Sequence, residues 1–352
     1  MFLKDLTELN GVSGNEEPVC RYIMKKISKY TNDITVDSMG NLIAIKNGTD
    51  RRHKLMVSAH MDEVGLMVSG YGENGTIKFK QVGGIDERIL IGKKVLIGDK
   101  KIPGVIGCKP IHLQEKQERK KNIKQKDMYI DIGAESKEDA ENLAPLGEYI
   151  SFKSEYTELG ADCIKAKALD DRIGCAILME ILKGQYSFDL AACFTVQEEI
   201  GLRGAEVVSY SVNPDLALVI EGTTCSDVPG AEEYEYSTLL GNGAVLTIMD
   251  RTSVADKSLV DYIYKVALKN RIPVQFKRTA TGGNDAGRIN VSRSGVKVAS
   301  ISVPCRYIHS PVSVMNKNDY TSCRNLLKEV LNELSKNREN FDVIRNGGEL
   351  IV

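Results

Sequence analysis

A histidine and a carboxylate lie two residues apart at the end of an apolar run that begins at Leu55. The run is typical of a buried strand, and residues i and i+2 of a strand point to the same face. His60 and Asp62 can therefore point into one cleft. A carboxylate beside a metal-binding imidazole is the usual partner that fixes the tautomer of the ring. An ordinary histidine near a strand end is the alternative interpretation of this segment.

Four further segments carry residue types that bind metals where a predicted strand ends; these residues are Asp170, Glu198 with Glu199, Glu221 and His309. Each has a plainer interpretation when it is taken alone. Asp170 could cap a helix, the glutamates could be polar strand ends, and His309 could be a loop histidine. Adjacent carboxylates such as Glu198 and Glu199 repel each other after a buried strand unless a positive charge compensates them.

Together these segments supply two histidines and three or four carboxylates at the strand ends of one sheet, where ligands of open α/β sheets gather. That set is sufficient for a pair of divalent metals, with one carboxylate bridging the ions and one left free as a base. Two metals about 3.5–4 Å apart can deprotonate a bridging water and stabilise a tetrahedral intermediate. Nitrogen and oxygen ligands suit zinc, cobalt or manganese better than soft metals.

The predicted elements that position these residues follow two patterns of secondary structure, one α/β and one β-rich. Strands alternate with helices before residue 65 and after residue 161, which predicts a layered, mixed-sheet α/β domain from residues 1–65 and 161–352. Residues 66–160 are short strand-like runs broken by glycine, which predicts an inserted β-rich, barrel-like domain. A length of 352 residues agrees with two domains.

Short motifs refine this picture near the N-terminus and in the insert. Residues 2–10 are predicted to form a helix, and Ser13 and Glu16 have the spacing of a capping box before a second one. A hairpin is expected around Ser38-Met-Gly. The basic segment 114–126 is predicted to be a solvated loop.

Bulk properties exclude several classes of function. The net charge of −1 gives no reason to expect nucleic-acid or anionic-membrane partners. No apolar run approaches 18 residues, and the N-terminus does not have the pattern of a signal peptide. Eight single cysteines without a Cys-x-x-Cys pair indicate buried thiols of a cytoplasmic protein. Of the other histidines, His53 is expected to face solvent and His112 to have a structural role.

Seven motifs in order along the chain resemble those of the tetrahedral, or TET, aminopeptidases, the glutamyl and deblocking aminopeptidases of metallopeptidase family forty-two. The motifs are Ser58-Ala-His-Met-Asp-Glu-Val-Gly, Pro103-Gly-Val-Ile-Gly, Asp131-Ile-Gly-Ala, Ala168-Leu-Asp-Asp-Arg, Gln197-Glu-Glu-Ile-Gly-Leu-Arg-Gly, Gly282-Gly-Asn-Asp-Ala and Arg306-Tyr-Ile-His-Ser-Pro. The resemblance covers nearly the whole chain. It implies a cytoplasmic enzyme that removes N-terminal residues from short peptides with a free N-terminus.

The resemblance also implies a role for each site residue. His60 and Glu221 bind one metal, Glu199 and His309 bind the other, and Asp170 bridges them. Glu198 is the general base that activates a metal-bridging water, and Asp62 orients the site from behind. The insert corresponds to the dimerisation domain of the family, whose dimers assemble into a tetrahedral dodecamer.

Two positions depart from the family pattern. Glu221 stands where aspartate is usual, which lengthens the ligand by one methylene and affects the first metal. Asn284 stands where threonine is common, near the substrate in relatives. Two alternatives to an aminopeptidase are a related dinuclear amide hydrolase, such as a deacylase or carboxypeptidase, and an assembly protein without turnover.

Overall fold

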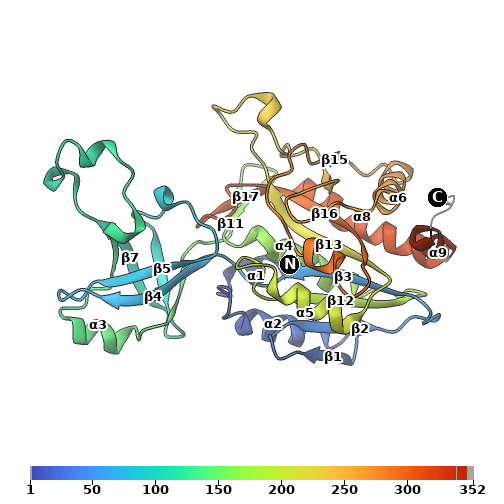
Figure 1. Cartoon of the computed structure of the whole chain (residues 1–352), viewed down its shortest axis with the longest axis horizontal. Coiled ribbons are helices and arrows are strands. Elements are labelled where there is room, and N and C mark those ends of the chain that lie inside the picture. The colour runs from blue at the N-terminus through green and yellow to red at the C-terminus, as the bar shows by residue number, and fades with distance from the viewer. Residues whose placement is uncertain (1, 338, 347–352) are drawn as a thin grey trace.

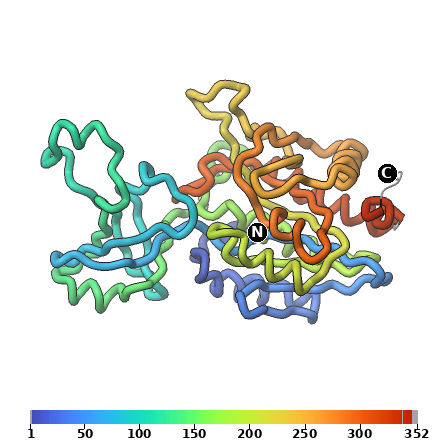
Figure 2. Tube along the Cα trace, viewed as in Figure 1, coloured from blue at the N-terminus to red at the C-terminus, as the bar shows by residue number. Residues whose placement is uncertain are grey.

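The computed structural model describes residues 2–337 and 339–346, which form two bodies side by side (Figure 1). One body is a large mixed sheet covered by helices, and the other is a small closed barrel. The tube in Figure 2 shows that both ends of the described chain belong to the larger body. The fold is therefore mixed α/β with a separate all-antiparallel barrel, as predicted.

The large sheet has 11 strands. Along its main path the order is β1 (Asp33–Val36), β2 (Leu42–Lys46), β12 (Asp189–Thr195), β3 (Lys54–His60), β13 (Leu216–Thr224), β16 (Lys297–Arg306), β17 (Ser313–Asn316), β11 (Cys163–Ala166) and β10 (Thr157–Leu159). β14 (Ala244–Thr247) pairs with β16 and with β15 (Val274–Phe276). The four central strands β12, β3, β13 and β16 run parallel.

These central strands are apolar because helices cover both of their faces. The core on one face contains residues of α1 (Phe2–Glu8), α2 (Glu17–Ile27), α4 (Leu169–Ile181), α6 (Lys257–Lys269), α8 (Lys317–Lys336) and α9 (Glu339–Asn346). The core on the other face contains residues of α5 (Arg203–Val212) and α7 (Ala286–Asn290). All seven residues of β12 are buried, which is typical of a strand enclosed between two helical layers.

The second body is a closed barrel of β4 (Gly65–Tyr71), β5 (Ile77–Val82), β8 (Met128–Asp131), β7 (Ile102–Cys108), β6 (Lys94–Ile97) and β9 (Tyr149–Phe152). The helix α3 (Lys137–Leu143) packs against it. Closure leaves the barrel without a free sheet edge. β3 ends at His60 and β4 begins at Gly65, so the first connection between the bodies passes directly beside His60.

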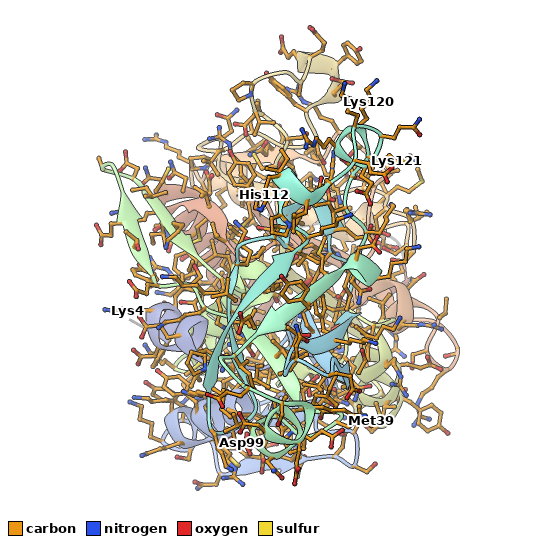
Figure 3. All side chains as sticks on the ribbon, turned by 90° about the vertical axis from the view of Figure 1, so that its left-hand side faces the viewer. Lys4, Met39, Asp99, His112, Lys120 and Lys121 are labelled. Carbon is orange, nitrogen blue, oxygen red and sulfur yellow. The ribbon has the colours of Figure 1, made fainter. Side chains whose placement is uncertain are left out.

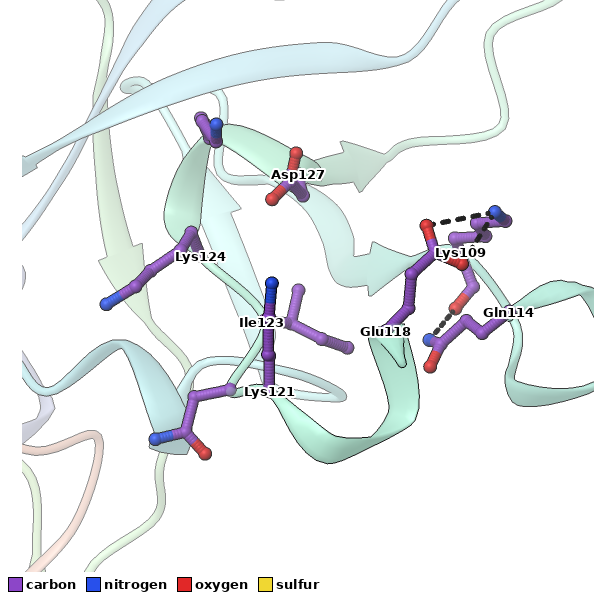
Figure 4. Close-up of a pocket in the computed structure, with 9 residues that line it drawn as sticks. Lys109, Gln114, Glu118, Lys121, Ile123, Lys124 and Asp127 are labelled. Carbon is purple, nitrogen blue, oxygen red and sulfur yellow. Dashed lines mark hydrogen bonds and ion pairs between the residues drawn. The ribbon is translucent and has the colours of Figure 1, made fainter. Parts of the chain in front are cut away.

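The basic segment of the barrel is exposed, as predicted, and folds into short 3-10 turns. Figure 3, which looks onto the barrel, shows Lys120 and Lys121 at one end of it and Asp99 at the other. The segment lines an open pocket of about 460 Å³ (Figure 4), where Lys109 pairs with Glu118 at 3.0 Å. The exposed ammonium groups account for the polarity of this segment.

Two local expectations are wrong. α2 begins at Glu17 and its N-cap is Glu16, so Ser13 does not cap the helix. His53 is buried rather than exposed because α9, which the sequence did not predict, places Phe341 against its ring at a centroid distance of 4.8 Å. The structural role expected of His112, which is exposed on the barrel, stays a prediction.

None of the helices formed by the described residues combines the length and the apolar character that a membrane span requires.

Candidate metal centre

The candidate site lies at the carboxyl ends of the central parallel strands. Thr195 at the end of β12 is paired in register with His60 at the end of β3, and Glu198 and Glu199 lie in the loop that follows β12. Glu221 lies within the last four residues of β13. His309 lies in the turn that joins β16 to β17. Parallel alignment therefore gathers side chains from distant segments at one edge of the sheet.

Asp170 lies between the two histidines of the site. Its Oδ1 is 3.4 Å from Nε2 of His60, and its Oδ2 is 3.8 Å from Nε2 of His309. Glu221 Oε1 is also 3.4 Å from Nε2 of His60, and Glu199 Oε2 is 3.3 Å from Nε2 of His309. The Nε2 atom of each histidine thus faces one oxygen of Asp170 and one oxygen of a second carboxylate.

The donor set fits divalent cations. Ligand atoms lie within 4.8 Å of one another in three overlapping groups, which are His60 with Glu198 and Glu199, His60 with Asp171 and Glu221, and Asp170 with Glu199 and His309. Oδ1 of Asp170 and Oε2 of Glu221 are buried without a hydrogen-bond partner. Buried carboxylate oxygens are normally satisfied, and bound cations are a regular way of satisfying them.

The pKa shifts at the site reflect several buried carboxylates that lie close together. Burial raises the pKa of Glu198 and Glu199 well above the ordinary range, and nearby carboxylates raise them further. Burial also raises the pKa of Glu221 to about 8. Burial lowers the pKa of His60, but the carboxylates around it outweigh this effect and raise it well above its usual value. Such shifts are typical of functional sites.

Asp62 holds the strand ends together from behind the site. Its Oδ1 accepts the backbone N–H of Glu198 at 3.0 Å, and its Oδ2 accepts that of Glu199 at 3.1 Å. Oδ1 is also 3.3 Å from Nδ1 of His60. Because Nδ1 faces a carboxylate behind the site, a proton is favoured there, and Nε2 is the nitrogen that would give up its proton to bind a cation.

A buried ion cluster supports the loop that carries Asp170. Glu63 accepts hydrogen bonds from Nζ of Lys167 at 2.6 and 2.8 Å, and the guanidinium of Arg172 lies 3.4 Å away. Arg172 also donates to the carbonyl oxygen of Met61 at 2.9 Å. Lys167 and Arg172 stand on either side of Asp170 in sequence, so the cluster ties its loop to the end of β3.

The structure thus brings all seven predicted site residues to one place. Asp171 and Asp285 also belong to this cluster, although their sequence context did not predict it. Asp171 lies within ligand distance of His60 and Glu221. Asp285 is buried beneath them, where its Oδ2 accepts hydrogen bonds from Thr195 at 2.6 Å and Ser58 at 3.3 Å. Both residues fall inside the motifs quoted above, but a motif does not show which of two adjacent polar residues points inward.

Comparisons with known proteins agree with this arrangement. Residues 40–326 match the M42 glutamyl aminopeptidase family, so the chain belongs to that family. A putative aminopeptidase of Acetivibrio thermocellus is 36% identical over 331 residues, which cover 94% of this chain and 97% of that protein. The family is one of peptidases, which makes this chain a hydrolase of the aminopeptidase type.

Solved structures give the same result. The TET aminopeptidase from the marine sediment archaeon Thaumarchaeota archaeon SCGC AB-539-E09 superposes with a TM-score of 0.92 at 34% identity, covering 97% of this chain and 98% of that one. The TET1 peptidase of Pyrococcus horikoshii, which can assemble into a tetrahedron or a large octahedral shell, gives a TM-score of 0.83 at 33% identity and covers 94% and 98% of the two chains.

Proposed function

We propose that this protein is a dinuclear metallo-aminopeptidase that removes N-terminal residues from short peptides. The observation that carries the proposal is the position of Asp170, with one oxygen toward each histidine of the site. A carboxylate in this position can bridge two cations. Family membership supports the peptidase activity, and the carboxylate–histidine cluster supports the dependence on metal.

The residues divide between two cation positions. His60 and Glu221 would hold one ion, Glu199 and His309 would hold the other, and Asp170 would be shared. Zinc and cobalt fit this set of imidazole and carboxylate ligands, and manganese is a third candidate. When bound, such a pair acidifies water and polarises the carbonyl of the scissile peptide bond.

Glu198 is assigned the role of general base. Its carboxylate lies within 4.8 Å of His60 and Glu199, while Asp62 holds its backbone N–H. In the proposed mechanism Glu198 takes a proton from the attacking water and returns it to the leaving amine. Asp62 fixes the backbone of Glu198 and the tautomer of His60, and so acts without contacting the substrate.

The wider organisation follows the relatives. We propose that residues 1–65 and 161–352 form the catalytic domain, and that 66–160 form a dimerisation domain around the barrel. The shell-forming TET1 peptidase of P. horikoshii supports a homo-oligomer built from such dimers, with a tetrahedral dodecamer as its proposed form. The eight cysteines, all free thiols in the structure, support a cytoplasmic location.

The proposal is tested with a panel of aminoacyl chromogenic substrates, assayed after chelation and again after addition of zinc, cobalt or manganese. We expect the chelator to abolish the activity and added metal to restore it. A matched peptide with an acetylated N-terminus should not be cleaved, since an aminopeptidase needs the free amine. Cleavage of the blocked peptide would favour a deacylase or carboxypeptidase, and a folded, metal-free, inactive protein would favour an assembly role.

A further inference from the structure

The segment that was expected to cap α2 points toward the site instead. Ser13 Oγ donates to Oδ2 of Asp62 at 2.6 Å. Oε1 of Glu16 accepts the backbone N–H of Gln197 at 3.0 Å and that of Gly14 at 2.8 Å. The side chains of Ser13 and Glu16 therefore both reach the strand ends that carry the site.

Three consecutive backbone N–H groups are held by two carboxylates in this arrangement. Glu16 binds the N–H of Gln197, and Asp62 binds those of Glu198 and Glu199. Gln197 has a φ of +56°, in the left-handed region that residues other than glycine rarely occupy. Such a conformation persists only where its surroundings enforce it, and the bond from Gln197 to Glu16 is one of those constraints.

The segment is itself firmly attached. Gly11 donates its N–H to Oε1 of Glu63 at 3.0 Å, and its carbonyl oxygen accepts the N–H of Glu63 at 3.0 Å. Gly14, with a φ of +92°, lies so close to the barrel that an added Cβ would come within 2.5 Å of the Tyr149 hydroxyl. Residues 11–16 are thus fixed at one end to the connection between the two bodies, and at the other end Glu16 binds Gln197.

Glu16 is buried without a compensating cation. It is 6% exposed, and within residues 2–337 and 339–346 no lysine or arginine pairs with it. A buried carboxylate of this kind is costly unless hydrogen-bond donors satisfy it. The donors that satisfy Glu16 are the backbone N–H groups of Gly14 and Gln197, so its carboxyl group is directed at the loop that carries Glu198.

We propose that Ser13 and Glu16 are positioning residues that hold the loop of the general base. In this role, which rests on the proposed function, Glu16 fixes Gln197 and Ser13 fixes Asp62, so that Glu198 and Glu199 stay in place at the candidate metal centre. Neither residue contacts the reacting atoms. The N-terminal segment 11–16 therefore supports the loop of the general base, although it lies far from Glu198 in sequence.

The test compares Glu16→Ala, Glu16→Gln and the matched control Glu17→Gln in the full-length, metal-loaded protein. Glu17 is next to Glu16, but its side chain is 67% exposed and pairs with Arg21 at the surface. Glu16→Ala is expected to lower kcat by about 10- to 100-fold with little change in KM. Glu16→Gln keeps an oxygen that accepts from Gln197 and should retain kcat within about threefold. Equal kcat for Glu16→Ala and the control would overturn the proposal.

Hydrogen–deuterium exchange of a peptide covering 193–203 gives a second readout that needs no turnover. In metal-free protein, Glu16→Ala should speed exchange of the amides of 197–199 by about tenfold, and Glu17→Gln should not. Unchanged exchange in Glu16→Ala contradicts the proposal even if the wild-type protein proves inactive, and faster exchange supports it in that case too.

If Glu16→Ala does not fold, Ser13→Ala tests the proposed positioning role instead. This variant removes one hydroxyl group and should lower kcat by about three- to tenfold, again with KM almost unchanged. A kcat within about twofold of the wild type would contradict the proposal. Wild-type activity in the same assay separates this result from a failure of the aminopeptidase assignment.

Discussion

Replacing Asp62 by asparagine isolates the group that we propose to orient the site. Asp62 is completely buried and acts as an acceptor for Ser13, Glu198 and Glu199, while its Oδ1 faces His60. An asparagine offers one oxygen and one NH₂ group to these donors. The less costly orientation keeps the oxygen toward Glu198 and His60 and turns the NH₂ toward Ser13, whose hydroxyl can rotate to accept. The N–H of Glu199 then has no acceptor.

The expected effect on stability follows from the one hydrogen bond that asparagine cannot make. One buried N–H left without an acceptor costs about 1–3 kcal/mol, which lowers the thermal midpoint of unfolding. Loss of the carboxylate behind His60 is expected to weaken metal binding by about 10- to 100-fold, or about 1.4–2.8 kcal/mol. The folded state of the site is retained because the two side chains have the same shape.

The assay is a cobalt titration against a competing chelator, combined with calorimetric melting of the metal-free protein. Asp261→Asn is the matched control, because Asp261 pairs with Lys257 on the exposed surface of α6, away from the site. Cobalt affinity and a melting midpoint that both equal those of the control would refute the reasoning, since Asp62 would then hold neither the imidazole nor the loop.

Three further predictions concern other carboxylates. Glu198→Gln should lower kcat by about 10²- to 10⁴-fold with unchanged metal content, measured by elemental analysis, and retained activity would remove Glu198 from the role of base. Glu63→Gln leaves Lys167 and Arg172 buried without an anion and should lower the free energy of unfolding by about 3–5 kcal/mol, measured by urea denaturation, whereas a loss below about 1 kcal/mol would contradict this. Burial raises the pKa of Glu16 from 4.5 to about 7, so the folded state retains a proton that the unfolded chain releases, and stability falls as pH rises through this window. In metal-free protein, the melting midpoint of Glu16→Gln relative to wild type should therefore rise between pH 4.5 and 7, and a constant difference would contradict the shift.

The sequence predicted the main elements of this fold because their hydrophobic patterns are unambiguous. The parallel strands β3, β12 and β13 are nearly continuous apolar runs, and the helices between them have regular apolar stripes. The same patterns located the ligands, since each follows an apolar run. The short strands β10 and β17 were missed because three or four residues carry too little periodicity.

Residues whose partners are distant in sequence were harder to predict. Ser13 and Glu16 fit the pattern of a helix cap, and nothing local indicates that their acceptor and donor lie at positions 62 and 197. His53 sits among charged neighbours, yet a helix almost 300 residues later covers it. The roles of such side chains depend on which segments the fold brings together, and a single sequence does not contain that information in local form.

The central claim is that His60, Asp170, Glu199, Glu221 and His309 hold two cations. Anomalous scattering from crystals grown with zinc or cobalt tests it most directly. The account predicts two peaks about 3.5–4 Å apart on either side of Asp170, one beside His60 and one beside His309. A fully loaded crystal with no peak at this edge of the sheet, or with its metal bound elsewhere, would contradict it.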